Sequence, residues 1–400
     1  MNMATRGALI IWFTLLVSDR SHGQDFLLEP GDHIALVGNT MAERMQHDGW
    51  LETFLHLRYP DHRLTFRDLG FSADPLTTRL RSSGFGSPDE HLRRIRADVV
   101  IMMFGFNESF AGEAGLSQFV DDLRAEIKRL LSQSYNNRSP PRLVLVSPIP
   151  VEPQSAWRTI PSEEINSRLA LYTQAMADVA AEHQIRFVDL FHPLAETFGA
   201  ESGEANESLE RAGLRQPLTI NGVHLNSRGN RIVAETLVKS LSGSLPNHDA
   251  QTVEKVRQAV LDKNFCWFHR YRTTDGYSIF GGRGDLEFVN RQTNREVMMR
   301  ELEILEAMAT NRDPVIWAAL RGESVAVDDT QTPPFLEVIS NIPGPNPDGS
   351  HQFLSGEEAI SKMRVLDGFE VTLFASEAEF PELANPVQMA FDTKGRLWVA

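Results

Sequence analysis

Between residues 32 and 243, short apolar segments alternate with longer segments whose apolar residues recur at helical spacing. The apolar segments cover residues 33–38, 63–70, 98–105, 142–150 and 185–191. The third, DVVIMMFG, is almost continuously apolar, as expected for a strand that is buried on both faces. Strands that alternate with helices predict an α/β fold with a doubly wound, mostly parallel five-stranded sheet.

The segments between these strands carry amphipathic helix patterns. Ile165, Leu169, Tyr172, Met176 and Val179 recur at spacings of four and three, and a similar stripe runs from residue 119 to 131. A last helix is predicted from about Ser227 to Leu241. These stripes predict helices that pack on the sheet and form its core, and not cofactor sites.

The remainder of the chain divides by composition. We predict a signal peptide at 1–23, the α/β domain at 24–244, a helical extension at 245–330, a linker at 331–362 and the start of a β-rich domain at 363–400. Segments 363–376 and 386–400 are predicted strands, with a turn at Asp392–Gly395. The segment 265–284 is rich in aromatic residues, arginine and glycine, so it either packs between helices or covers the site and stacks on a sugar ring.

Export is predicted from the first residues. A basic residue, an apolar stretch of about ten residues and small residues before position 24 form a secretory signal, with an uncleaved anchor as the alternative. The single cysteine, Cys266, permits no intrachain disulfide, so we expect the periplasm or cell surface of a bacterium. The net charge of −15 argues against nucleic acid as a partner. We expect no membrane span after cleavage of the signal.

The chemistry is expected where strands end, because ligands of such sheets sit beyond the carboxyl ends of the strands. The first turn offers Gly38-Asn39-Thr40, the second Gly70 and the third Gly105-Phe106-Asn107, and Asn221-Gly222-Val223-His224 precedes the last helix. A hydroxyl at a helix N-terminus, a close backbone N–H and an amide can form an oxyanion hole around a nucleophile. His224 can act as the base, so the constellation predicts acyl transfer.

Each element also has a structural interpretation. Thr40 alone can cap the following helix, Gly70 can serve only a turn, Asn107 can bond its own loop, and His224 can be structural. The order of the four elements, each beside the sheet, favours the catalytic interpretation.

On these residues the chain resembles the SGNH, or GDSL-type, hydrolases, over about residues 30–243. Gly38, Gly70, Gly105, Asn107 and His224 match that family's motifs. The resemblance implies a flavodoxin-like sheet and ester hydrolysis, with Thr40, His224 and Asn221 at the catalytic positions. It also implies an oxyanion hole formed by Thr40, Gly70 and Asn107.

Three substitutions fall on the chemistry. Threonine stands at the position of the family's serine, and Asn39 and Asn221 stand at two aspartate positions. The β-methyl of threonine crowds attack and restricts χ1. Asn221 can hold His224 but cannot stabilise its imidazolium. We therefore expect either an attenuated esterase for carbohydrate or small esters, or a glycan-binding module without turnover.

The segment from 368 to 400 resembles the first strands of the β-propeller in membrane-bound, PVC-type dehydrogenases. A propeller needs several blades of four strands each, so only its start would be present. If the α/β domain binds a glycan without turnover, we expect it to contact and position this propeller. No Cys-x-x-Cys-His motif occurs, and we expect neither a cofactor nor a metal in this chain.

Overall fold

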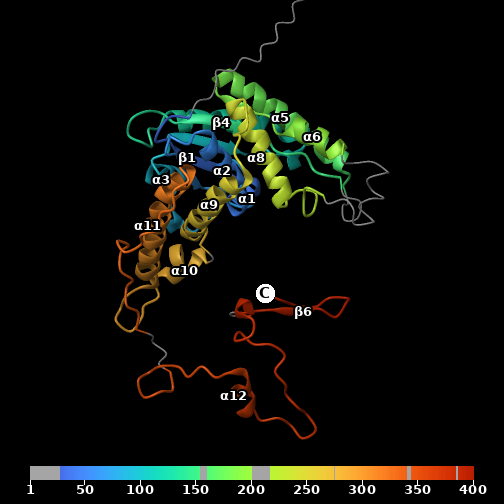
Figure 1. Ribbon diagram of the computed structural model, residues 1–400. Helices are drawn as coiled ribbons and strands as arrows, with labels where there is room; N and C mark the ends of the chain where they lie inside the picture. Colours follow the sequence, from blue (N-terminus) through green and yellow to red (C-terminus); the bar gives the residue numbers. More distant parts are fainter. Residues whose placement is uncertain (1–27, 154–159, 201–216, 274, 340–343, 384–385) are drawn as a thin grey trace, which may run out of the picture. The chain divides into compact units, whose positions relative to one another are not determined.

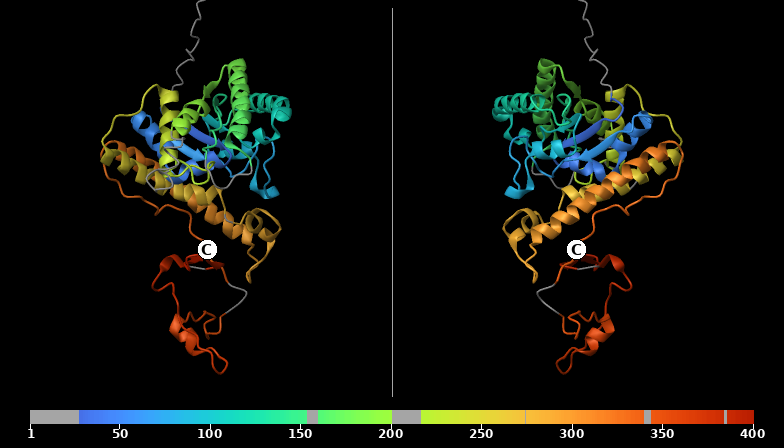
Figure 2. Two further views of the ribbon diagram at one scale, coloured as in Figure 1. Left: turned by 90° about the vertical axis from the view of Figure 1, so that its right-hand side faces the viewer. Right: turned by 90° about the vertical axis from the view of Figure 1, so that its left-hand side faces the viewer.

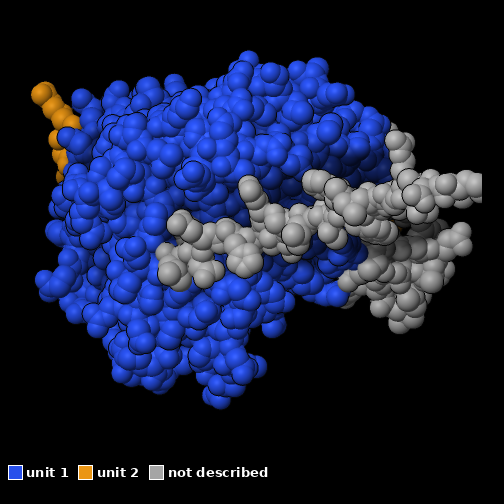
Figure 3. Space-filling view, turned by 90° about the horizontal axis from the view of Figure 1, so that it is seen from above, with its two compact units in different colours: residues 1–287, 292–337 blue, residues 288–291, 338–400 orange. Residues whose placement is uncertain are grey.

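The computed structural model describes residues 28–400, apart from 154–159, 201–216, 274, 340–343 and 384–385 (Figure 1). The predicted signal peptide therefore lies outside the described residues. The chain divides into two compact units, coloured separately in Figure 3. Unit 1 comprises residues 1–287 and 292–337, and unit 2 comprises residues 288–291 and 338–400.

Unit 1 is built on a five-stranded sheet in which all paired strands are parallel, in the order β2-β1-β3-β4-β5. Its strands are β1 His33–Gly38, β2 Thr65–Asp68, β3 Val99–Met103, β4 Arg142–Val146 and β5 Arg186–Val188. Each strand lies inside the segment predicted for it, so the α/β prediction is confirmed.

Helices cover both faces of this sheet (Figure 1). They are α1 Thr40–Asp48, α2 Trp50–Arg58, α3 Pro88–Arg94, α4 Leu116–Leu131, α5 Ser162–His183, α6 Phe191–Ala200, α8 Ser227–Ser242, α9 Ala250–Tyr271, α10 Gly276–Phe280 and α11 Asn294–Leu320. Because side chains alternate along a strand, Ile34 and Leu36 pack under α1, α2 and α8, whereas Ala35 and Val37 pack under α3, α4 and α5. The sheet is therefore buried on both sides.

Helices α9 and α11 run side by side and close the edge of the sheet at β2 (Figure 2). Three side chains donate to the outward carbonyls of this edge. Trp317 Nε1 donates to Leu64 O at 2.9 Å, Lys263 Nζ to Phe66 O at 3.2 Å and Trp267 Nε1 to Asp68 O at 2.7 Å. An edge strand otherwise presents unpaired groups to other chains, so the two helices cap it.

Two buried ion pairs fix α9 and α11 in this position. Lys263 Nζ lies 2.8 Å from Glu52 Oε2, and Arg67 forms a two-pronged pair with Asp313 at 3.0 and 2.7 Å. Trp267 is 2% exposed, which confirms that this part of the aromatic segment packs rather than faces a ligand. The helical extension thus shares the core of the sheet.

Unit 2 contains helix α12 Gly356–Ser361 and one antiparallel hairpin, β6 Met389–Phe391 with β7 Leu397–Val399. The predicted turn is present, since Asp392 Oδ1 accepts from the backbone of Lys394 and Arg396. The prediction of a strand at 363–376 is wrong, because the described residues offer this segment no pairing partner. The described part of unit 2 shows a hairpin and no propeller blade.

Candidate active site

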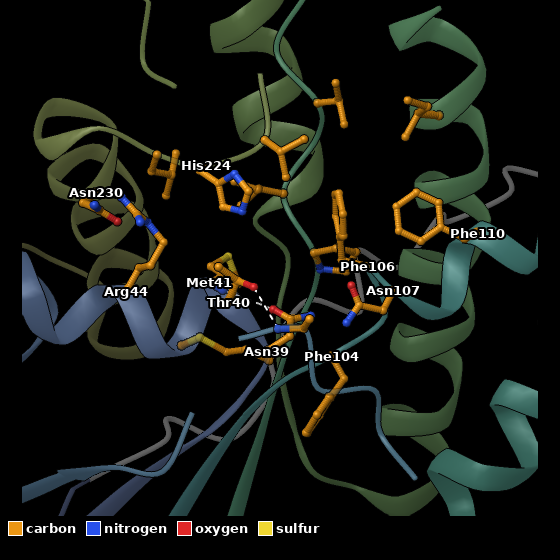
Figure 4. Close-up of a pocket in the computed structure, with 18 residues that line it drawn as sticks. Asn39, Thr40, Met41, Arg44, Phe104, Phe106, Asn107, Phe110, His224 and Asn230 are labelled. Atoms are coloured by element: carbon orange, nitrogen blue, oxygen red, sulfur yellow. Dashed lines mark hydrogen bonds between the residues drawn. The ribbon is translucent and has the colours of Figure 1, made fainter. Parts of the chain in front are cut away.

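A cavity of about 350 Å³ opens at the carboxyl ends of β1, β3 and β4 in unit 1. Its wall is mostly apolar, with Phe106 and Phe110 on one side (Figure 4). Thr40, Asn107 and His224, three of the predicted site residues, all line it. The structure therefore brings together the first turn, the third turn and the loop before α8.

The first turn presents the hydroxyl of Thr40. Asn39 is the N-cap of α1, and its Oδ1 accepts from Met41 N at 3.2 Å. Asparagine and aspartate cap helices about equally well, so the asparagine here keeps the turn intact. Thr40 is the first residue of α1 and not its cap, which leaves its hydroxyl for the cavity.

The Thr40 hydroxyl accepts a hydrogen bond from the backbone of Ala73. Ala73 N donates to Thr40 Oγ1 at 3.0 Å, and Ala73 lines the cavity. Its φ of 65° is in the left-handed region, which costs free energy for a residue with a side chain. Strained backbone of this kind concentrates where structure serves function. Ala73 thus supplies a donor at the nucleophile position.

Gly70, the predicted donor from the second turn, is not among the residues that line the cavity. Its N–H donates to Asp68 Oδ1 at 2.7 Å. A Cβ built on Gly70 would lie 2.5 Å from the backbone nitrogen of Glu43. The glycine therefore permits the turn after β2 to contact α1, and the donor role that we predicted for it stays a prediction.

The third turn holds Asn107 at the cavity. Gly105 has a φ of 100°, and its N–H donates to Glu108 Oε2 at 2.8 Å. Asn107 Nδ2 donates to Asp74 O at 3.2 Å, which links the second and third turns. An amide nitrogen carries two hydrogens, so Asn107 retains one for a ligand.

The loop before α8 fixes the tautomer of His224. Asn221 Oδ1 accepts from the backbone N–H of Val223 at 3.2 Å and of His224 at 3.0 Å, so this atom must be the amide oxygen. His224 Nδ1 lies 3.1 Å from the same oxygen and must therefore donate to it. The free lone pair is then on Nε2, as a general base requires. Burial lowers the pKa of His224, and the guanidinium of Arg44 lowers it further.

A buried carboxylate anchors this loop. Glu152, which follows β4, is 1% exposed and accepts from Leu218 N at 3.0 Å and from Thr219 N at 2.8 Å. The N–H of Glu152 donates to Gly222 O at 2.8 Å. Because these contacts hold both ends of the turn that carries Asn221 and His224, Glu152 acts as a positioning residue.

Two polar residues near the second turn lie outside the cavity. Ser72 donates its hydroxyl to the carboxylate of Glu43. Asp68 is 4% exposed, and burial raises its pKa well above the usual range for a carboxyl group. Neither residue lines the cavity, so neither replaces Thr40 there.

Residues 31–232 match the model of the GDSL-like lipase/acylhydrolase family, which covers half of the sequence. The chain belongs to this family. Residues 355–400 match a separate domain of unknown function. No curated protein matches the chain at a significant level.

Solved structures with a similar fold share little sequence with this family member. A gut microbial diltiazem-metabolizing enzyme is 13% identical, with a TM-score of 0.40 over 54% of this chain and 48% of the other. The chain thus spans about half the length of that enzyme. An acetyl xylan esterase is 18% identical (TM-score 0.36; 52% and 99% covered). A carbohydrate acetylesterase from Sinorhizobium meliloti is 12% identical (TM-score 0.37; 53% and 99% covered).

Three residues at this acylhydrolase site had no clear signal in the sequence. Ala73 donates through its backbone, and alanine gives no hint of a left-handed conformation. Glu152 acts on a loop about 70 residues away. Only the four-residue spacing from Thr40, in the helix predicted to follow the first turn, could have placed Arg44 on the same helix face. Among the described residues, no group of three or more histidine, cysteine or acidic side chains could hold a metal. Within the same residues, no helix combines the length and apolar character that a membrane span needs.

Proposed function

We propose that the cavity hydrolyses esters of carbohydrates or small acids, with Thr40 as the nucleophile and His224 as the base. One observation carries this proposal. The hydroxyl of Thr40, the imidazole of His224 and the amide of Asn107 line a single cavity, with Ala73 N–H directly on the hydroxyl. That set contains a nucleophile, a base and a candidate oxyanion donor in the amide of Asn107.

The reaction has two steps. Thr40 Oγ1 attacks the ester carbonyl while its proton passes to His224 Nε2, and the negative oxygen is bound by the side-chain N–H of Asn107 and the backbone N–H of Thr40. The carbonyl then re-forms, the alcohol leaves with the proton from His224, and Thr40 remains acylated. A water molecule, activated by His224, cleaves this acyl group and restores the hydroxyl.

Two features support a slow reaction. The β-methyl of Thr40 restricts the approach of its hydroxyl to the carbonyl carbon. Asn221 holds His224 in the correct tautomer but carries no charge to stabilise the imidazolium that forms. We expect the missing charge and the methyl group to lower the rate of hydrolysis. The tautomer of His224 should not lower it, because Nε2 keeps its lone pair.

The test is hydrolysis of p-nitrophenyl acetate and acetylated xylan by the full chain. We expect a slow rate that exceeds that of His224→Ala, and a rise of at least tenfold in Thr40→Ser. Equal rates for the wild type and His224→Ala would reject the esterase proposal.

A second candidate function is glycan binding without turnover. Among the described residues, Thr40 Oγ1 accepts from Ala73 N and no hydrogen bond joins Thr40 to His224. Phe110 is 60% exposed beside the cavity and offers a ring on which a sugar can stack. Tight binding of xylan oligosaccharides by a chain that lacks His224-dependent hydrolysis would favour this candidate.

We also propose that the chain is exported to a bacterial periplasm or cell surface. We further propose that residues 355–400 form the start of a propeller that contacts unit 1. Fractionation of cells that produce the chain with and without residues 1–23 tests the export step. An experimental structure that shows whether residues 363–400 join a four-stranded blade tests the propeller.

A further inference from the structure

Arg44 is the one side chain with a permanent charge among the described residues that line the cavity. It lies four residues after Thr40 on α1, so both side chains project from the same face of that helix. Neither aspartate nor glutamate occurs among the lining residues in the part of the chain that the structure describes. The cavity therefore joins an apolar wall to a single cation beside the nucleophile (Figure 4).

The guanidinium of Arg44 has no partner in the described part of the chain. Its Nε is buried without a hydrogen bond, and no carboxylate of the described residues lies within ion-pair distance. Neighbouring Asn230 directs its amide to Asp48 Oδ2 at 2.6 Å instead. By contrast, Arg67 is paired with Asp313, and Arg81 with Asp74.

An unpartnered cationic group next to apolar side chains attracts an anion more strongly than it would in water. Guanidinium donors match the geometry of a carboxylate. Four residues of α-helix separate Thr40 from Arg44 by roughly 6 Å along the helix axis. An anion on Arg44 and an ester carbonyl on Thr40 thus fit within one small molecule or one sugar ring.

We propose that the substrate of this site is an ester that carries a carboxylate on the same small framework, such as an acylated uronic acid or an acylated hydroxybenzoic acid, and that Arg44 binds this carboxylate. The hydrolysis of such an ester rests on the proposed esterase function. The recognition of a carboxylate by Arg44 can be measured without turnover.

The probe is 4-acetamidobenzoate, an amide that mimics 4-acetoxybenzoate, and its neutral partner is 4-acetamidobenzamide. Calorimetry on the full chain should show that the anion binds at least tenfold more tightly than the amide. Arg44→Gln should abolish this preference, Arg44→Lys should retain part of it, and exposed Arg283→Gln should leave it unchanged. Melting curves verify that each variant is folded.

The outcomes separate the two proposals. A wild type that shows no preference for the anion, or a preference that persists in Arg44→Gln, overturns the role of Arg44 even if esters are hydrolysed. A preference that depends on Arg44, in a chain without His224-dependent hydrolysis, supports carboxylate recognition and rejects the esterase proposal. Should Arg44→Gln fail to fold, Arg44→Lys decides the matter: a reduced preference supports the role of Arg44, and an undiminished preference overturns it.

Discussion

Replacing Asn221 with aspartate tests the proposed cause of slow turnover. In the structure, Asn221 Oδ1 accepts from two backbone N–H groups and from His224 Nδ1, and an aspartate oxygen can accept all three. The substitution therefore adds a negative charge and leaves the loop and the tautomer of His224 as they are.

The size of the effect follows from the distance. His224 Nδ1 lies 3.1 Å from Asn221 Oδ1, which puts the centres of the two charges about 5 Å apart. At effective dielectric constants between 80 and 20, Coulomb's law gives roughly 1 to 3 kcal/mol of attraction for the imidazolium. Because His224 is partly exposed, we expect the lower half of that range, a rise in kcat of about 5- to 30-fold.

The assay is hydrolysis of p-nitrophenyl acetate as a function of pH. A base must be neutral to accept a proton, so kcat/KM should rise with pH through the pKa of His224. Burial and Arg44 lower that pKa, so the wild-type inflection should lie below pH 6.5. The aspartate variant should move the inflection to higher pH, because its charge favours the imidazolium.

Asn221→Ala and the double variant Asn221→Asp with His224→Ala serve as controls. The alanine should lower the rate, because it releases the imidazole from its tautomer. An unchanged kcat in Asn221→Asp, or a gain that survives the loss of His224, would refute the reasoning.

Three other outcomes are expected. Glu152→Gln should lower the kcat of p-nitrophenyl acetate hydrolysis several-fold with little change in KM, because the loop of His224 loses a charged hydrogen-bond acceptor. An equal loss of kcat in Glu113→Gln would contradict a specific role of Glu152. Trp267→Phe should lower the free energy of unfolding in urea by about 1–3 kcal/mol, because Asp68 O is left buried without its donor; a loss under 0.5 kcal/mol would argue against the edge cap. Burial and Arg270 lower the pKa of His91 in the folded protein to about 4. As the pH falls from 6.5 towards 4, the unfolded state takes up a proton that the folded state does not, so the free energy of unfolding should fall by about 2 kcal/mol at pH 5. The variant His91→Gln should lack this pH dependence.

The sheet could be predicted from the sequence because parallel strands bury both faces and leave continuous apolar runs. The rule that ligands lie beyond the carboxyl ends of such strands then located Thr40, Asn107 and His224 correctly at one cavity. Gly70 permits contact with α1, its N–H donates to Asp68 Oδ1, and the donor role predicted for it at the cavity stays a prediction. The hydrogen bond from Ala73 N to Thr40 depends on backbone conformation, which the sequence does not reveal.

Contacts between distant segments were beyond sequence reasoning for a different reason. The helices α9 and α11 are predictable from periodicity, but their position at β2 depends on single partners such as Lys263 with Glu52, which are 211 residues apart. The same holds for Glu152, which no spacing connects to Thr219. A strand at 363–376 was predicted from composition, and a strand requires a pairing partner that composition does not supply.

Acidic residues are absent from the cavity lining that the structure describes, and this absence links the two proposals. Burial and the cation of Arg44 both oppose protonation of His224, and Asn221 supplies no charge that would favour it. A carboxylate bound at Arg44 would cancel the positive field at the moment when His224 takes the proton of Thr40. An anionic ester would then bring part of the charge that the site lacks. Asn221→Asp should accordingly raise kcat more for p-nitrophenyl acetate than for 4-acetoxybenzoate. In an Arg44→Gln background the two esters should gain equally. Equal gains for both esters in the presence of Arg44 would show that the bound anion has no influence on His224.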